Sequence, residues 1–376
     1  MNWLKKTLAD VAGTQEPDYG PSAIQPVTKQ AETKPYTELR SEHLKWHAME
    51  STCVETQTFY FTTDEGVTCM AQVIYSNVMG VRTTCQFNTK IYDHDGPGKH
   101  QWCSDPLSNH GFDEPRTGFY ADNVSVSLSE DGTTYTIKSA VNDDNICNLT
   151  VKRAAPGFMA GENGTSFFGT DPKNPWGSMW HKFWPRATVS GTMQTKKKTY
   201  NVNGRAVFIH ALQGMKPHHA AARWNFVNFQ TPTYSAVMME FTTPSSYGKT
   251  VVNVGCIAKD GEILYAGCSN SVKHLAATTD PVSDWPEPKA LLCNWESKDG
   301  KSIEAELMID LPERADRVDV LAHVPAIIKN LIGGVVGTKP IIFQYIAKDK
   351  AALKVKEAGN ETSETGQLFS EATFIS

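Results

Sequence analysis

Three closely spaced stretches decide the fold: TQTFYFTT (residues 56–63), VTCMAQVIYS (67–76) and TTCQFNTKIYD (83–93). Each is rich in β-branched and aromatic residues, which either alternate with polar residues or follow one another in short runs. Short segments containing Gly, Asp or Asn separate them. Period-two alternation between closely spaced turns is typical of antiparallel strands. The sequence therefore predicts an all-β protein of the sandwich or barrel type.

A weak internal repeat indicates two similar halves. TFYFTTDEGVTCMAQVIYSN (58–77) resembles AVMMEFTTPSSYGKTVVNVGCIAKDG (236–261), and SEDGTTYTIKS (129–139) resembles SKDGKSIEAEL (297–307). The two motifs occur in the same order in both halves, and the second is built around an Asp-Gly turn. We therefore expect two tandem all-β domains.

The expected domains cover residues 41–217 and 218–376, with the boundary near residues 214–222. Each has room for roughly eight strands of the usual ~5–6 residues. Eight antiparallel strands close a barrel that can hold one small apolar ligand. Two tandem antiparallel β-barrels are the predicted architecture.

Composition excludes several classes of protein. The 376 residues carry a formal net charge of −5, and the one compact basic run, Lys196-Lys197-Lys198, is typical of a solvated hairpin tip. A nucleic-acid surface would need clustered Lys and Arg, so no nucleic-acid partner is expected. The eight cysteines form no C-x-x-C motif, which predicts buried free thiols and neither a zinc site nor another metal site.

Targeting signals and membrane spans are not evident in the sequence. No run of 18 apolar residues occurs, and Lys5 and Lys6 interrupt the N-terminal apolar residues as no signal peptide would. We expect a cytosolic protein whose four N-x-[ST] matches carry no glycans; they begin at Asn123, Asn148, Asn163 and Asn360.

The N-terminus, MNWLKKTLADVAG (1–13), predicts a short amphipathic helix. At ~100° per residue its apolar side chains fall within an arc of ~160°; they are Met1, Trp3, Leu4, Leu8 and Val11. Lys5 and Lys6 lie opposite, as in helices that dock on a lipid surface. Docking on a membrane is favoured over docking on the β-domains, because residues 14–40, with four prolines, predict a flexible linker.

Tryptophans are concentrated in NPWGSMWHKFWPRA (174–187). The four-residue spacing of Trp176, Trp180 and Trp184 predicts one face of a short helix, with Pro185 ending it. Such a helix would close one end of a barrel. It would either belong to the core or, together with Phe183, line the entrance for an apolar ligand, and the sequence favours neither.

The strand predicted in RAVFIHALQGM (205–215) contains one histidine, His210. The favoured interpretation is a strand histidine that hydrogen-bonds a neighbour. The alternative is a polar anchor for an apolar ligand whose pocket walls would include Phe208, Trp224 and Phe226. No phosphate-binding loop and no G-x-S-x-G motif occurs, so no catalytic residue is assigned.

The long motifs NPWGSMWHKFWPRA and GRAVFIHALQGMKPHHAAARWNFVNFQT (204–231), with EPDYG (16–20) and the amphipathic start, resemble the fungal survival factor family over essentially the whole chain. The resemblance implies two tandem lipocalin-like barrels that carry ceramide between endoplasmic reticulum and Golgi without vesicles. It also implies peripheral attachment to those membranes by the N-terminal helix, and a role in sphingolipid metabolism and oxidative-stress survival. No cofactor is implied, and a monomer is favoured, with a nuclear fraction as a further expectation.

A broader resemblance is to bacterial carotenoid hydratases of related tandem-barrel build. These need an acidic residue in the strand that matches RAVFIHALQG, and this chain has none there. Two hypotheses therefore enter the structural analysis. The chain is a cytosolic lipid carrier, or it is an enzyme on an apolar isoprenoid or lipid substrate with His210 as acid or base.

Overall fold

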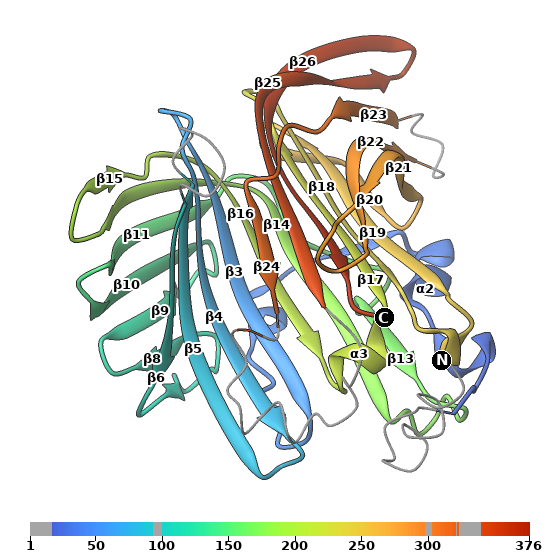
Figure 1. The fold of residues 1–376 in the computed structure, drawn as a ribbon, viewed down its shortest axis with the longest axis horizontal. Coiled ribbons are helices and arrows are strands. Elements are labelled where there is room, and N and C mark those ends of the chain that lie inside the picture. The colour runs from blue at the N-terminus through green and yellow to red at the C-terminus, as the bar shows by residue number, and fades with distance from the viewer. Residues whose placement is uncertain (1–16, 93–99, 298–302, 321, 323–339) are drawn as a thin grey trace.

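The computed structural model describes residues 17–92, 100–297, 303–320, 322 and 340–376. Two antiparallel sheets, of 16 and 10 strands, make up most of this part of the chain (Figure 1). The predicted all-β class with two tandem β-domains is confirmed. The predicted N-terminal helix over residues 1–13 lies outside the described residues.

The first sheet follows a continuous ladder. Its order is β6 (His100–Leu107), β5 (Arg82–Tyr92), β4 (Thr68–Val78), β3 (Cys53–Thr63), β16 (Gly204–Gln213), β14 (Gly177–Gln194), β11 (Asn145–Arg153), β10 (Thr134–Asn142), β9 (Val124–Leu128), β8 (Phe119–Ala121) and β7 (Gly111–Phe112). Short strands join beside it: β1 (Ile24–Gln25), β2 (Tyr36–Glu38), β12 (Phe158–Ala160), β13 (Thr165–Phe168) and β15 (Thr199–Asn201). The run Lys196–Lys198 lies between β14 and β15, as predicted for a hairpin tip.

The second sheet repeats this arrangement with fewer strands. Its order is β20 (Glu262–Gly267), β19 (Val251–Lys259), β18 (Tyr234–Thr242), β17 (Arg223–Gln230), β26 (Asn360–Phe374), β25 (Ile341–Glu357), β23 (Ile303–Asp310), β22 (Pro286–Glu296) and β21 (Asn270–Thr279), with β24 (Asp316–Asp319) paired to β25. Short helices connect the strands: η1 (Pro21–Ala23), α2 (Val27–Thr33), η2 (Ser41–Leu44), α3 (Pro217–Ala220) and η3 (Ser245–Tyr247). The chain passes from one sheet to the other through α3.

The two sheets have repeated topology, but the sequence repeat matches each strand of the first half to a strand one place too late in the second half. In each sheet an early strand pairs with the last strand, β3 with β16 and β17 with β26. This makes β3 the counterpart of β17, whereas the sequence match had set β3 and β4 against β18 and β19. The Asp-Gly match is displaced in the same direction. Hairpins of one meander share the same alternation and turn residues, so pattern alone does not fix which strand matches which.

The helix predicted from the tryptophan spacing is wrong, because that stretch forms most of the strand β14. Four-residue spacing keeps side chains on one face of a strand as well as of a helix, since the strand period is two. Trp180 and Trp184 point into the core of the first sheet, while Phe183 faces the opposite way. Pro185 sits where the β14–β16 register is irregular, a position where a strand tolerates a missing N–H.

The flexible linker predicted over residues 14–40 is also wrong for the part that is described, residues 17–40. β1 pairs with β13 and β2 with β12, and Ile24 and Val27 are buried. The backbone N–H groups of Tyr19 and Gly20 both donate to the Ser246 carbonyl in η3, at 2.9 Å. Prolines fix turns in this segment without preventing packing, so the segment clamps both sheets.

Three hydrophobic clusters hold the fold together. One lies within the first sheet around Phe59 and Trp184, and another lies within the second around Trp295. The third lies between the two sheets and includes Tyr60 and Phe226. All eight cysteines are free and six are buried, as predicted. None of the described helices is long and apolar enough to span a bilayer.

We expect Ile24→Ala to lower the free energy of unfolding by about 2–5 kcal/mol, because a fully buried branched side chain leaves a cavity. Lys29→Ala, at an exposed position of α2, should change it by less than ~0.5 kcal/mol. Urea unfolding of both variants measures the difference. Equal stabilities would mean that the docked segment does not support the sheets.

Candidate functional site

The structure distributes the predicted site residues among three places. Four of them lie inside the first sheet, namely Trp180, Trp184, Phe208 and His210. Three lie between the sheets, namely Phe183, Trp224 and Phe226. Trp176 lies just before β14 and is 46% exposed, with its Nε1–H donating to the Tyr247 hydroxyl at 3.1 Å. The tryptophans therefore do not form one surface.

His210 is fully buried and hydrogen-bonded to a residue that the sequence analysis missed, Glu55 of β3. The His210 Nε2 and Glu55 Oε1 atoms are 2.9 Å apart, and Glu55 also accepts from the backbone N–H groups of His47 and Ala48. Burial raises the pKa of Glu55, but these hydrogen bonds outweigh it and hold the pKa below its ordinary value. Burial lowers the pKa of His210 despite the carboxylate. Because Glu55 already accepts two backbone N–H groups, the geometry favours the Nε2–H of His210 as a third donor to this carboxylate.

Aromatic rings fill the space around this pair. The ring of His210 lies 5.2 Å from Trp46 and 4.8 Å from Trp180, between ring centroids. Phe208 lies 4.8 Å from Tyr135 and 5.2 Å from Trp184. Such separations correspond to rings in contact. The part of the first sheet that holds His210 is thus a packed aromatic core.

The third hydrophobic cluster forms an inter-sheet layer, in which outward faces of the two sheets meet. Tyr60 of β3 lies 4.9 Å from Phe226 of β17 and 5.1 Å from Phe369 of β26, between ring centroids. His181 of β14 is buried in this layer, edge-on to Trp224 at 5.7 Å. Burial lowers the pKa of His181 to about 4, so it is neutral at physiological pH.

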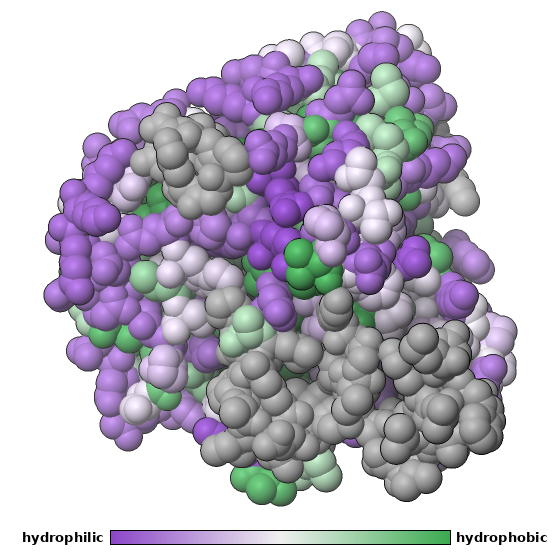
Figure 2. Space-filling model, in the orientation of Figure 1, coloured by the Kyte–Doolittle hydropathy of each residue, from purple (hydrophilic) through white to green (hydrophobic). Residues whose placement is uncertain are grey.

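Polar side chains join the two sheets at one end of the inter-sheet layer. There Arg186 donates to the Ser235 hydroxyl at 3.1 Å, and Gln367 donates to the Thr68 hydroxyl at 2.7 Å. Towards the opposite strand ends, three apolar side chains of the layer are only half-buried: Ala211, Trp224 and Met239. The face drawn in Figure 2 is mostly hydrophilic, with small groups of hydrophobic atoms between the hydrophilic ones.

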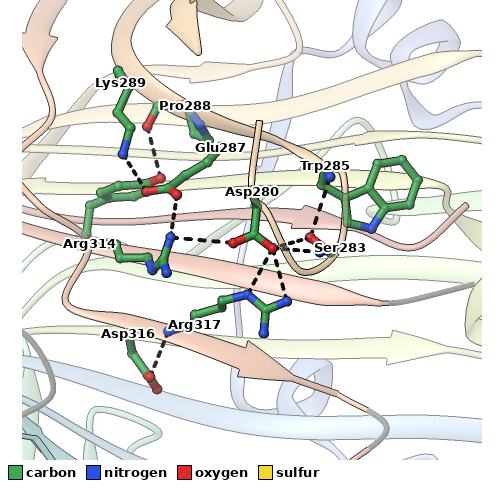
Figure 3. Close-up of polar contacts among 10 residues, drawn as sticks. Asp280, Ser283, Trp285, Glu287, Pro288, Lys289, Arg314, Asp316 and Arg317 are labelled. Carbon is green, nitrogen blue, oxygen red and sulfur yellow. Dashed lines mark hydrogen bonds and ion pairs between the residues drawn. The ribbon is translucent and has the colours of Figure 1, made fainter. Parts of the chain in front are cut away.

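An ion network borders the layer at β24 (Figure 3). Asp280, fully buried, accepts from Arg317 at 3.1 and 3.2 Å, and together with Ser283 these hydrogen bonds lower the pKa of Asp280 against the effect of burial. Arg314 pairs with Glu287 on the same side. Asp316 pairs with the buried Lys90 of β5.

This network ties one short strand to both sheets. Lys90 also donates to the Gln344 side-chain oxygen at 2.7 Å, and the Tyr92 hydroxyl donates to the same oxygen at 2.6 Å. The ion pairs join residues far apart in the sequence, so no local pattern could have revealed them. Within the described ranges, no group of three or more His, Cys, Asp or Glu side chains is placed to hold a metal ion.

Comparison with known proteins identifies similar chains along the whole length. A family model described as "Svf1 family" matches residues 1–376. The chain is 58% identical to "Ceramide-binding protein svf1" of Aspergillus fumigatus and 41% identical to the protein of the same name from Schizosaccharomyces pombe. These alignments cover all of this chain, with 100% and 99% of the relatives' own lengths.

Solved structures with the same fold have little sequence similarity. CghA aligns with a TM-score of 0.58 at 13% identity, covering 86% of this chain and 89% of its own. Kievitone hydratase from Nectria haematococca aligns with a TM-score of 0.53 at 10% identity, covering 96% of this chain and 98% of its own. These similarities support the fold alone.

His181 generates a prediction on acid stability. In the unfolded chain this imidazole takes up a proton below about pH 6.5. In the folded chain it stays neutral until about pH 4. Stability should therefore fall as pH drops through this window, by about 3 kcal/mol from this group. His181→Phe should flatten the dependence, measured by urea unfolding between pH 7 and 4. An unchanged slope would contradict the burial of a neutral His181.

Proposed function

Because this chain belongs to the Svf1 family, we propose that it binds one ceramide or similar apolar lipid and carries it through water between membranes. Relatives named as ceramide-binding proteins match over their full length at 58% and 41% identity, and this supports the proposal most directly. The membranes would be those of the endoplasmic reticulum and Golgi, with the stress-survival role following from lipid supply. A binding protein needs no catalytic group.

The inter-sheet layer is the proposed place of the lipid, and its partly accessible apolar side chains are the observation that carries the proposal. A ceramide has two apolar chains, which need apolar surface that can be reached from outside. The first sheet's core around His210 is already filled by aromatic rings in contact. By contrast Trp224 and Met239 present half-buried apolar surface beside the aromatic cluster of Phe226.

Polar groups for an uncharged head group border the same layer. A ceramide head carries only amide and hydroxyl groups, which need hydrogen-bond partners and no ion pair. On β5, Asn88 lies two residues from Lys90 and so on the same face of the strand. Its Nδ2 donates to Gln72 at 3.1 Å, which leaves its buried Oδ1 as an unpaired acceptor. A lipid amide or hydroxyl could donate to it.

Membrane attachment through residues 1–13 completes the proposed cycle. The apolar arc of Met1, Trp3, Leu4, Leu8 and Val11, with Lys5 opposite, fits an interfacial helix that holds the carrier near its donor and acceptor membranes. A carrier of this kind would be cytoplasmic and peripheral on both membranes.

An enzyme on an apolar substrate is the second candidate, and the Glu55–His210 pair is the observation that favours it. A carboxylate that fixes the imidazole tautomer is the arrangement used in general-base catalysis. The contacts of His210 with Trp46 and Trp180 argue against it, because they leave the imidazole fully buried. Mass spectrometry of co-purifying lipids separates the two: unmodified ceramide supports the carrier, and a substrate–product pair supports the enzyme.

Substitutions of three tryptophans test where the lipid binds. Trp224→Ala should weaken ceramide binding by about tenfold or more, because apolar contact area is lost. Trp176→Ala, at the exposed position, should bind ceramide normally. Trp180→Ala should lose on the order of 3–5 kcal/mol of stability, while its folded fraction binds normally. Binding to fluorescent ceramide and melting temperature are measured together. If only the Trp180 variant binds ceramide more weakly, the lipid lies within the first sheet and not in the inter-sheet layer.

The membrane role of the N-terminus has its own test. Leu8→Glu places a charge in the apolar arc, so flotation with lipid vesicles should be lost. Ceramide binding in solution and melting temperature should stay as in the unaltered chain. A lower melting temperature together with normal flotation would instead indicate that residues 1–13 pack on the β-domains.

A further inference from the structure

A row of polar side chains crosses the inner face of the second sheet. Asn225 of β17 lies directly opposite Glu240 of β18, and Glu240 lies directly opposite Asn253 of β19. Directly opposed residues share a face. Val227 and Met238, two residues further along the same face, belong to the sheet's apolar core. The row therefore lies at the border between that core and water.

The strand β21, from the far edge of the sheet, covers this row. The Val272 backbone N–H donates to Glu240 Oε2 at 3.4 Å, and His274 Nε2 lies 2.8 Å from Asn225 Oδ1. Asn270 packs against Gly255, where a Cβ would lie 2.9 Å from the amide carbon of Asn270. Because Gly255 follows Asn253 by two residues on one face, Asn270 lies beside the next position after Asn253 on that face of β19. We call Glu240, Asn253 and Asn270 the acceptor cluster.

The hydrogen bonds fix which atoms of the acceptor cluster are left free. Asn253 Nδ2 donates to the Glu240 carboxylate at 2.8 Å, so its Oδ1 points away from that bond. Asn270 Nδ2 donates to the Gly267 carbonyl at 2.9 Å, and its Oδ1 is likewise set. Both amide oxygens are buried and have no hydrogen-bond partner. Neither amide can be turned round, because a carboxylate and a carbonyl only accept.

Charge at the acceptor cluster is negative. Asn225 Nδ2 also donates to Glu240, at 3.1 Å, so every polar contact described for this carboxylate is an uncharged N–H. Within the part of the chain that the structure describes, no Lys, Arg or His forms an ion pair with Glu240. Burial and the nearby Arg223 lower the pKa of His274, which leaves that imidazole neutral. Glu240 and Asn270 are half-buried and Asn253 is 4% exposed, so the cluster lies just beneath the surface.

We infer that the acceptor cluster is a binding site for a protonated primary amine. A –NH3⁺ group carries three donors and one positive charge, and it meets here one carboxylate and two unpaired amide oxygens. A hydroxyl offers a single donor and no charge. A calcium ion would need six to eight oxygen ligands, far more than these three side chains provide.

The amine that suits this chain is the head of a long-chain amino alcohol. Ceramide is the N-acyl derivative of such an amine, so its nitrogen carries no charge and one hydrogen. The acceptor cluster would therefore recognise the lipid that N-acylation consumes and amide hydrolysis releases. This choice of amphiphile rests on the proposed function, whereas the amine specificity rests on the geometry alone.

The test uses the full chain with sphinganine and its N-acetyl derivative as probes, titrated by calorimetry. Sphinganine should bind in two events, one at the lipid site and one at the acceptor cluster. Glu240→Gln should lower the affinity of the second event about 10- to 100-fold, as expected when a charged hydrogen-bonding partner is lost. N-acetylsphinganine should bind the variant and the unaltered chain equally. Asn253→Ala should weaken sphinganine in the same direction, and Glu262→Gln, at an exposed position of the same sheet, should change nothing.

Several outcomes would overturn the inference. Equal loss of both probes in the Glu240 variant would mean that the cluster only supports the fold, and melting temperatures identify that case. If Glu240→Gln binds sphinganine as tightly as the unaltered chain does, the acceptor cluster is not an amine site. Failure of N-acetylsphinganine to bind the unaltered chain, with sphinganine bound normally, would refute the proposed function and leave the amine site intact.

Discussion

The structure depends on strands that are buried on both faces. β14 and β16 turn one face into the core of the first sheet and the other into the inter-sheet layer. A strand in this position is buried at every residue, as β14 is from Met179 to Ala187. Its polar residues, His181, Lys182 and Arg186, are buried with it. The two sheets form one body because they share this doubly buried wall.

That constraint also explains what could be predicted from the sequence. Strands with one solvent-exposed face, such as β10 and β11, show alternating burial. Residues 56–93 are largely buried on both faces, and their β-branched and aromatic residues between closely spaced turns predicted the all-β class correctly. β14 has no such alternation, so the spacing of Trp176, Trp180 and Trp184 fitted a helix equally well. The run of charge located the hairpin tip at Lys196–Lys198, and turn chemistry located the Asp131-Gly132 turn between β9 and β10. It did not fix which hairpin of one half matches which of the other, because all of them follow the same rules.

The candidate sites were harder to predict, because their parts come from distant segments. His210 could be singled out as a histidine in an apolar strand, but its partner Glu55 lies 155 residues away. Phe226 was predicted from one motif, and its neighbours Tyr60 and Phe369 come from opposite ends of the chain. The acceptor cluster had no sequence signal, because Asn and Glu in strands are usually solvated. Asn225, Glu240 and Asn253 form one row only because of the register of β17, β18 and β19.

The clamp formed by residues 17–40 has a consequence for synthesis of the protein on the ribosome. Tyr19 and Gly20 donate to a carbonyl in η3, and Ile24 pairs with Phe168, so this early segment has its partners more than 140 residues later. The last strand, β26, must also emerge before β17 gains its second neighbour. Long-range pairing of this kind is slow and leaves apolar edges unpaired while the chain grows. During synthesis, residues 17–25 therefore reach their final contacts only after β13, and then η3, have been added to the chain.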